Sequence, residues 1–199
     1  ILDSFMHKKF FKKYYFIDKF NKSNLVKQCE NTIIIYRNYK KNSNEAEILL
    51  LKNYCRKKNL QFVISNNVKL SIKLDLDGVY IPSFNKSYKH LSYNFKKDFL
   101  LIGSAHNLNQ IRIKEMQGVN EIFLSSIFKK NTNFLGINKF KIISNYSKKK
   151  IIALGGISER NIKLLKLTKS IGFAGISYFK GKKKRPLKRG LLNKYLQTN

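Results

Sequence analysis

The sequence has few of the residues that cross-link small extracellular domains or interrupt strands. Its 199 residues include two cysteines, Cys29 and Cys55, and neither has CxxC spacing or a histidine close by. We therefore expect two reduced thiols in a cytoplasmic protein, and neither a disulfide framework nor a metal site built on cysteine. The two prolines, Pro82 and Pro186, fall outside the interior of every strand that the sequence predicts.

Long apolar runs are also absent. No run approaches the roughly 20 residues that span a bilayer, so no contact with a membrane is expected. The segment that opens the sequence, ILDSFMHKKFFKKYYF, is basic and aromatic. It is not predicted to be a signal peptide, because it lacks an apolar core followed by a small-residue cleavage site.

Acidic residues are scarce: 11 Asp and Glu residues stand against 41 Lys and Arg residues, which gives a formal net charge of +30. Such an excess is typical of proteins with a polyanion partner, either nucleic acid or an anionic membrane surface. Lysine is spread over nearly every segment, however, and Asn, Ile, Phe and Tyr share its A/T-rich codons. Codon bias is therefore the favoured explanation, and nucleic acid is the less favoured one. The run at 180–189, KGKKKRPLKR, is a candidate anion patch under either.

Short apolar segments alternate with amphipathic ones along the chain, and 43% of the residues are hydrophobic. Eight segments, apolar and largely β-branched or aromatic, have the pattern of strands buried on both faces. These predicted strands are residues 14–18, 32–37, 61–65, 78–81, 99–103, 121–124, 151–154 and 173–176.

Helices are predicted in four of the amphipathic segments. Ser158 is expected as the N-cap of the third helix, with Glu159 in its first turn. The segments are 44–58, 107–117, 158–168 and 186–196. In the first of them, the apolar stripe is expected at Ala46, Leu49, Leu50 and Tyr54.

Strands that alternate with helices, without a long linker or a break in composition, specify a parallel sheet. Eight such units favour a closed barrel over an open doubly wound sheet, and about 200 residues is the small end of the range for that barrel. The expected fold class is therefore α/β, a single-domain TIM (β/α)8 barrel. We expect it to span residues 14–199, after an N-terminal extension of residues 1–13.

Small and polar residues, none of them acidic, follow the predicted strands at their carboxyl ends, where barrel enzymes carry their working residues. The strongest pattern is IIALGGIS, in which a strand runs into Gly155 and Gly156 and then into the expected helix start at Ser158. Glycines let backbone N–H groups approach an anion, and a helix start adds unpaired donors. With Lys180 from the eighth loop, we predict a phosphate site here; a tight turn without a ligand is the alternative.

Two further junctions supply candidate catalytic residues. His106 follows the fifth strand beside Ser104 in GSAHN, and histidine is suited to proton transfer near neutral pH. A capping or packed ring is the alternative for His106. Arg37 ends the second strand in IIIYRNYK without an acidic neighbour, and we expect it to bind an oxyanion.

Taken together, these junctions resemble those of the thiamine-phosphate synthase / TenI (thiazole tautomerase) family, over about residues 14–180. IIIYRNYK is similar to the family's Gln-x-Arg-x-Lys strand end, FVISNNVKL to its Ile-Asn-Asp-Arg stretch, and LDGVYIPS to Asp-Gly-Val-His-Leu-Gly. GSAHN matches its Ser-x-His loop, IFLSSIF resembles a strand ending in Pro-Val-Phe, and IIALGGIS matches Ala-x-Gly-Gly-Ile. The order and spacing of these pieces carry the resemblance.

The resemblance implies the same barrel and phosphorylated ligands of the thiamine pathway. Synthases of the family couple a pyrimidine diphosphate to a thiazole phosphate with Mg²⁺, and the tautomerase isomerises a thiazole carboxylate phosphate through a histidine at the position of His106. By the same match, Arg37 would contact the diphosphate or pyrimidine and Ser104 the diphosphate. Gly155 and Gly156 would hold the thiazole phosphate.

The sequence departs from the family where metal ligands are expected. The family's Asn-Asp pair is Ser65-Asn66 here, and its second metal carboxylate falls near Asn85. Mg²⁺ prefers anionic oxygen ligands, so Mg²⁺ binding is expected to be weakened and no cofactor or metal ligand is assigned. Ser65 and Asn66 remain candidate substrate contacts. The family's Gln and Lys in the second strand end are Ile35 and Tyr39, although Lys40 lies next to Tyr39.

Three hypotheses follow, with an enzyme favoured over a binder. The first is a synthase-type transferase with a degenerate metal site, in which Lys129, Lys130 or Lys180 supplies the lost positive charge. The second is a metal-free tautomerase-like enzyme that uses His106 as acid and base. The third is a non-catalytic binder of a phosphate ligand or nucleic acid. The resemblance favours the first, the altered residues favour the other two, and the oligomeric state is left open.

Overall fold

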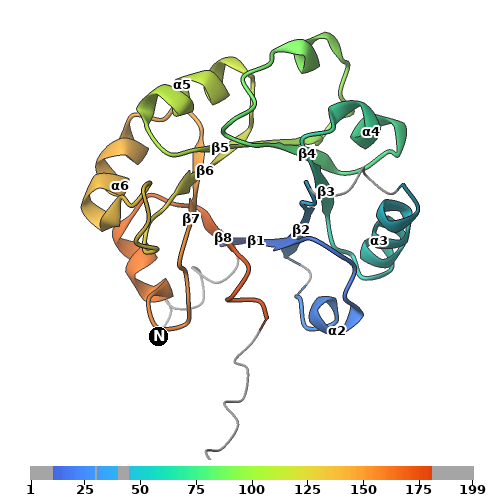
Figure 1. The fold of residues 1–199 in the computed structure, drawn as a ribbon, viewed down its shortest axis with the longest axis horizontal. Helices are drawn as coiled ribbons and strands as arrows, with labels where there is room; N and C mark the ends of the chain where they lie inside the picture. The colour runs from blue at the N-terminus through green and yellow to red at the C-terminus, as the bar shows by residue number, and fades with distance from the viewer. Residues whose placement is uncertain (1–10, 30, 40–44, 181–199) are drawn as a thin grey trace, which may run out of the picture.

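Eight parallel strands close into a barrel in the computed structural model, which describes residues 11–29, 31–39 and 45–180 (Figure 1). Each strand pairs with its neighbours in sequence, and the last pairs with the first. The helices lie around the outside of the ring of strands (Figure 1). The predicted fold class, a TIM (β/α)8 barrel, is confirmed.

All eight predicted strands are present, and their ends differ from the prediction by at most two residues. The first strand begins at Lys12, two residues before the predicted start of the barrel. Residues 1–10 of the predicted extension and the predicted helix at 186–196 lie outside the described residues. The strands are β1 (Lys12–Ile17), β2 (Thr32–Tyr36), β3 (Phe62–Ser65), β4 (Gly78–Ile81), β5 (Leu100–Ala105), β6 (Glu121–Ser125), β7 (Lys150–Leu154) and β8 (Gly172–Gly175).

The inside of the barrel is filled by side chains. One buried cluster takes residues from all eight strands and from no helix, so it is the interior layer. Its centre is aromatic: the rings of Phe16, Tyr80 and Phe123 have centroids 5.4 to 5.5 Å apart. A ligand can therefore reach only the rim of the barrel, where the loops after the strands meet.

The opposite end of the barrel is sealed by a buried carboxylate. Glu121, 2% exposed, begins β6 and accepts hydrogen bonds from the Tyr14 hydroxyl and, over 2.5 Å, from Lys12 Nζ. Burial, reinforced by the neighbouring carboxylate, raises the pKa of Tyr14, so the phenol stays protonated and donates. This end of the barrel, where the strands begin, therefore has a structural role and lies away from the rim.

Short polar caps start several of the helices. The side chain of Asn67 accepts from Leu70 N before α4, and that of Asn107 accepts from Gln110 N before α5, both over 3.0 Å. No helix in the described part of the chain has the length and apolar character needed to cross a membrane. The helices are α2 (Lys22–Leu25), α3 (Glu45–Lys57), α4 (Val68–Lys73), α5 (Leu108–Met116) and α6 (Gly136–Asn145), with 3-10 helices η1 (Lys89–Ser92) and η2 (Ile162–Leu167).

The apolar stripe predicted for the helix at 44–58 is wrong at Ala46, Leu49 and Leu50, whereas Tyr54 packs against the core as expected. The buried residues of α3 are Ile48, Leu51 and Cys55, whereas Leu49 is 40% and Leu50 is 52% exposed. The stripe that packs against the barrel follows the i, i+3, i+7 spacing of a helix face. In a segment with three consecutive leucines, more than one face of the helix has this spacing, and only packing against the barrel decides which face is buried.

The helix predicted to begin at Ser158 is also wrong. A turn follows Ser158, and the next helix is the 3-10 helix η2, which begins at Ile162. The side chain of Asn161 closes the turn: its Oδ1 accepts from Ser158 N over 2.9 Å, and its Nδ2 donates to Gly156 O over 2.9 Å. The diglycine is therefore not followed by an α-helix N-terminus, and no helix dipole acts there.

Candidate active site

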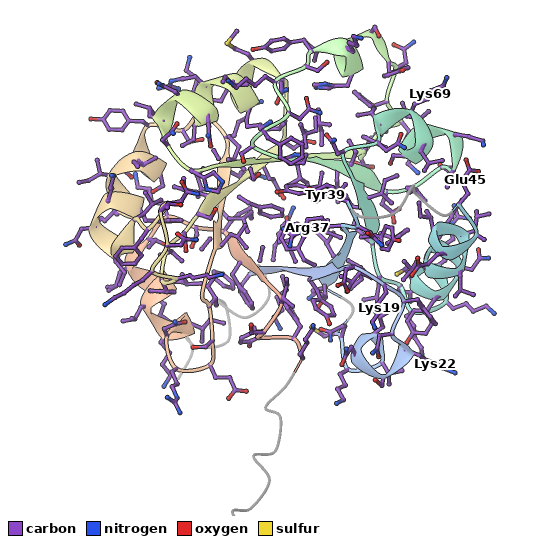
Figure 2. The ribbon with its side chains drawn as sticks, viewed as in Figure 1. Lys19, Lys22, Arg37, Tyr39, Glu45 and Lys69 are labelled. Carbon is purple, nitrogen blue, oxygen red and sulfur yellow. The ribbon has the colours of Figure 1, made fainter. Side chains whose placement is uncertain are left out.

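Arg37 lies at the rim, directly after β2. Its backbone N–H donates to Ile17 O over 2.7 Å, which continues the β1–β2 pairing, and its guanidinium carbon lies 4.8 Å from the centroid of the Phe16 ring. At this distance the face of the Phe16 ring stabilises the guanidinium cation. In Figure 2, Arg37 and Tyr39 lie toward the middle of the ring of strands, whereas Glu45 and Lys69 lie outside the ring, by the helices.

A cavity of about 140 Å³ opens beside Arg37. Three cationic side chains border it, those of Lys19, Arg37 and Lys180, against one carboxylate, that of Asp18. It lies at the carboxyl ends of β1, β2 and β8, and its polarity suits an anion. The remaining lining residues are Tyr15, Phe16, Ile17, Asn21, Asn24 and Ile176.

Asn66 and Asn85 meet on the next part of the rim. Asn66 follows β3 with a φ of 60°, a left-handed conformation that asparagine tolerates better than most residues. Asn85, in the loop after β4, donates from Nδ2 to Asn66 Oδ1 over 2.7 Å. In the part of the chain that the structure describes, no group of three or more His, Cys, Asp or Glu side chains could hold a metal ion.

Ser65 is held by Tyr39, the residue that replaces the family's lysine. The Tyr39 hydroxyl lies 2.8 Å from Ser65 Oγ, and its ring meets the ring of Phe84 edge-on, with centroids 5.7 Å apart. Tyr39 is 53% exposed. The side chain that would carry a positive charge in the family is therefore an uncharged phenol that links β2 to β3.

Ser104 lies below the rim. Its side chain is 3% exposed, and its Oγ accepts from the Tyr80 hydroxyl over 2.8 Å. Burial raises the pKa of Tyr80 to about 12, so the phenol stays protonated and remains the donor. The Ser104 hydroxyl then still has its own proton to donate.

His106 is fixed at both ring nitrogens. Nδ1 lies 3.1 Å from Ser125 O and 3.0 Å from Ser125 Oγ, and Nε2 lies 3.2 Å from Ser83 Oγ. A carbonyl oxygen only accepts, so in the neutral ring Nδ1 carries the proton and Nε2 holds a lone pair toward Ser83. The half-buried ring is thus oriented as a base.

Gly155 and Gly156 approach the loop after β6 more closely than any side chain would allow. Their φ angles are 106° and 74°. A Cβ on Gly155 would lie 2.3 Å from Ser126 Oγ, and one on Gly156 would lie 2.6 Å from Lys129 N. The glycines therefore have a structural requirement that needs no ligand.

The same turn nevertheless presents donors. Gly155 O accepts from Phe128 N and Lys129 N, but among the described residues the backbone N–H groups of Gly155, Gly156 and Ile157 have no acceptor. Consecutive unpaired N–H groups in a turn are an arrangement that binds anions. The glycines do not line the cavity beside Arg37, so the rim has two separate groups of donors.

The loop that carries Asn85 is anchored by a buried lysine that the sequence reading did not single out. Lys114 is 0% exposed, and its Nζ donates to Pro82 O, Asn85 O and Gln117 Oε1 over 2.8, 2.7 and 2.8 Å. Burial lowers its pKa to about 8. A sequence signal existed: Lys114 is three residues after Ile111 and shares its buried face of α5.

Comparisons with known proteins show which family the chain belongs to. A family model described as thiamine monophosphate synthase matches residues 22–179. The chain belongs to this family. The resemblance seen in the sequence is thereby confirmed.

Individual members of the thiamine monophosphate synthase family show how far the likeness extends. A thiamine-phosphate synthase of Methanococcus vannielii is 26% identical over 149 residues, which are 71% of this chain and 72% of that protein. A putative thiamine-phosphate synthase 2 of Aquifex aeolicus is 32% identical over 124 residues, 59% of this chain and 64% of that protein. Among solved structures, a thiamine phosphate pyrophosphorylase from Pyrococcus furiosus superposes with a TM-score of 0.72 at 19% identity, over 89% of this chain and 91% of that one.

Proposed function

We propose that the chain is a transferase of thiamine-phosphate synthase type, which joins a pyrimidine diphosphate to a thiazole phosphate. In that reaction the thiazole nitrogen attacks the methylene carbon of the pyrimidine, a C–N bond forms, and the C–O bond breaks. The electron pair of that bond leaves with the diphosphate. One observation carries the proposal: two separate sets of anion-binding groups occupy one barrel rim, as two phosphorylated substrates require.

The first set is proposed to bind the diphosphate. Arg37 and Lys180 border the cationic cavity, and the guanidinium fork is suited to two phosphate oxygens at once. Ser65 and Asn66 lie at the end of the neighbouring strand β3, and Ser104 lies below the rim on β5. Cations placed beside the leaving diphosphate would stabilise the charge that develops as the C–O bond breaks.

The second set is proposed to hold the thiazole phosphate. The N–H groups of Gly155, Gly156 and Ile157 would donate to its oxygens. The close approach of this turn to Ser126 and Lys129 keeps the donors in place before a ligand arrives. The binding there depends on backbone geometry, so it does not need the helix start that was expected after Ser158.

A divalent cation does not fit the residues of the rim. Mg²⁺ in proteins is held by carboxylates and other hard oxygens in octahedral geometry. Asn66 and Asn85 offer neutral amides at the positions where the family has carboxylates, and no cluster of acidic side chains replaces them among the described residues. We therefore assign no step of the reaction to a metal.

The test is a coupling assay with the full chain, a pyrimidine diphosphate and a thiazole phosphate, in which the coupled product and the released diphosphate are both quantified. We expect product, and we expect Arg37→Gln to lower kcat/KM by about 100-fold, because a charged contact to the diphosphate is lost. Lys141→Gln, an exposed change on α6, should leave the rate unchanged. An inactive wild-type chain, with and without Mg²⁺, would refute the proposal.

A second candidate function, isomerisation of a thiazole phosphate by proton transfer, is favoured by one observation. The lone pair of His106 Nε2 is directed at Ser83 while Nδ1 is tied to Ser125. A histidine so oriented can remove a proton and return it. His106→Gln should abolish tautomerisation; unchanged turnover would exclude His106 from the chemistry.

Nucleic-acid binding is not part of the proposal. The lysines of the described chain lie on elements all around the barrel, with examples on β1, α3, α6 and η2, and they do not follow one stripe. Nucleic-acid sites concentrate their positive charge on one face. The cytoplasmic location expected from the cysteines stays a prediction.

A further inference from the structure

The orientation of the two rim amides is set by a backbone group. The N–H of Ser87 donates to Asn85 Oδ1 over 2.8 Å, and a backbone N–H has no choice of role. Asn85 must therefore present its Nδ2 to Asn66, and the 2.7 Å contact makes Asn66 Oδ1 the acceptor. The chain of bonds assigns oxygen and nitrogen in both side chains.

This orientation occupies one lone pair of each side-chain oxygen and leaves N–H groups free to donate. Both side-chain oxygens already accept a hydrogen bond, from Ser87 N and from Asn85 Nδ2. The Asn66 Nδ2 group has no acceptor among the described residues, and the second proton of Asn85 Nδ2 is left as well. Asn66 is exposed, so its donors face solvent at the rim. A pair of carboxylates at this position would attract a cation, whereas the amides of Asn66 and Asn85 present N–H donors.

Helix α5 fixes this group from behind. Lys114 Nζ and Gln117 Nε2 both donate to Asn85 O, over 2.7 and 3.1 Å, and Gln117 Nε2 also donates to Ser87 O over 2.8 Å. These bonds hold the backbone of the segment that orients Asn85. Among the described residues Lys114 has no carboxylate partner, so no described acidic side chain offsets its positive charge behind the amide pair. Preorganised donors with a cation behind them favour an anion.

We propose that Asn66 and Asn85 bind an oxygen of the substrate's diphosphate directly, with no divalent cation between. The identity of the ligand rests on the proposed transferase function, whereas the polarity of the site rests on the hydrogen bonds alone. The rim then attracts a diphosphate with Arg37 and Lys180 on one side and with amide donors on the other.

The experiment is calorimetric titration of the full chain with inorganic pyrophosphate, once in EDTA and once in excess Mg²⁺. We expect binding in both, with dissociation constants within about threefold of each other. Asn66→Ala should weaken binding in EDTA by about tenfold, the value of one hydrogen bond to a charged group. Asn66→Asp should weaken it further in EDTA, because a carboxylate repels the anion, and Mg²⁺ should restore part of the loss.

Asn145→Asp is the matched control, since it makes the same chemical change at the end of α6; it should leave both constants unchanged. Urea unfolding of each variant separates lost binding from lost folding, and aspartate tolerates the left-handed backbone of position 66 nearly as well as asparagine. Pyrophosphate binding that requires Mg²⁺, an Asn66→Asp variant that binds normally in EDTA, or no binding in either buffer would overturn the inference. If the coupling assay yields product but pyrophosphate binding requires Mg²⁺, this inference is overturned and the transferase proposal stands. If pyrophosphate binds in EDTA but the coupling assay yields no product, only the transferase proposal is overturned.

Discussion

Lys114 Nζ lies 2.7 Å from the backbone oxygen of Asn85, so a helix on the outside of the barrel holds a rim loop by a buried ammonium. All three protons of the ammonium are used, and every acceptor is neutral. This makes Lys114 a structural support for the site. Its loss should disturb the rim and the fold together.

Replacing Lys114 by methionine keeps the volume of the side chain and removes the three donors. The oxygens of Pro82 and Gln117 would lose their partner, so we expect the free energy of unfolding to fall by about 2 kcal/mol. Pyrophosphate affinity should fall as well. Urea unfolding and calorimetry measure the two effects, and the exposed Lys141→Met provides a control that should change stability by less than about 0.5 kcal/mol. Wild-type stability in the Lys114 variant would show that these hydrogen bonds contribute nothing.

The same residue should give the fold a pH dependence in the alkaline range. Burial lowers the pKa of Lys114 from 10.5 to about 8 in the folded protein. Between these values the unfolded chain holds a proton that the folded protein has released, so stability contributed by this group rises with pH. The free energy of unfolding of wild type minus that of Lys114→Met should not depend on pH below about pH 8. From there to about pH 10 this difference should increase, because wild type gains stability relative to the variant. A difference that stays constant over this range would contradict the assignment.

Substitution of Gly155 should destabilise the protein far more than substitution of Gly175. Both lie at the carboxyl end of a strand: Gly155 directly follows β7, and Gly175 ends β8. An alanine Cβ at Gly155 would lie 2.3 Å from Ser126 Oγ on a backbone with a φ of 106°, whereas at Gly175 nothing lies within 4 Å. We expect Gly155→Ala to cost about 3 kcal/mol and to weaken binding of thiazole phosphate. Gly175→Ala should be close to neutral. Thermal unfolding with and without the ligand compares the two variants, and equal behaviour would refute the geometry of the turn.

The buried Glu121, at the end of the barrel opposite the rim, should stabilise the fold without affecting ligand binding at the rim. Glu121→Leu would leave the buried Tyr14 hydroxyl without its acceptor and Lys12 without its partner, and should cost about 3 kcal/mol. Glu45→Gln breaks an exposed pair with Lys73 and should cost less than about 1 kcal/mol. Neither variant should change pyrophosphate affinity at the rim. A weakened ligand in Glu121→Leu would show that the two ends of the barrel are coupled.

Local pattern predicted the strands because each is buried on both faces and so must be apolar along its length. It also predicted α5, because the N-cap residue Asn107 directly precedes the first turn of the helix that it caps. The prediction failed after Ser158, where the side chain of Asn161 competes for the same backbone groups and forms a turn. It failed again on α3, because a run of leucines does not specify which of them faces the barrel.

The positions of the rim residues could be predicted, but their pairing could not. Ser65 ends a strand, and Arg37, Asn66 and the diglycine directly follow strands, which in a parallel barrel places them all at one end. The partners are another matter: Ser83 and His106 are 23 residues apart, and Tyr39 and Ser65 are 26 apart. No local spacing relates such residues, because their contacts depend on how loops from neighbouring strands lean together.

The sequence by itself determined a closed parallel barrel with a polar, carboxylate-poor rim, because burial and strand order are written in residue type and spacing. Only the tertiary structure decided what that rim can bind. The donors and acceptors of Asn66 and Asn85 are assigned by a backbone N–H of Ser87, and the loop that carries it is held by Lys114 from a helix 29 residues further along the chain. Hydrogen-bond polarity belongs to the assembled network, and so it is fixed only when the chain has folded.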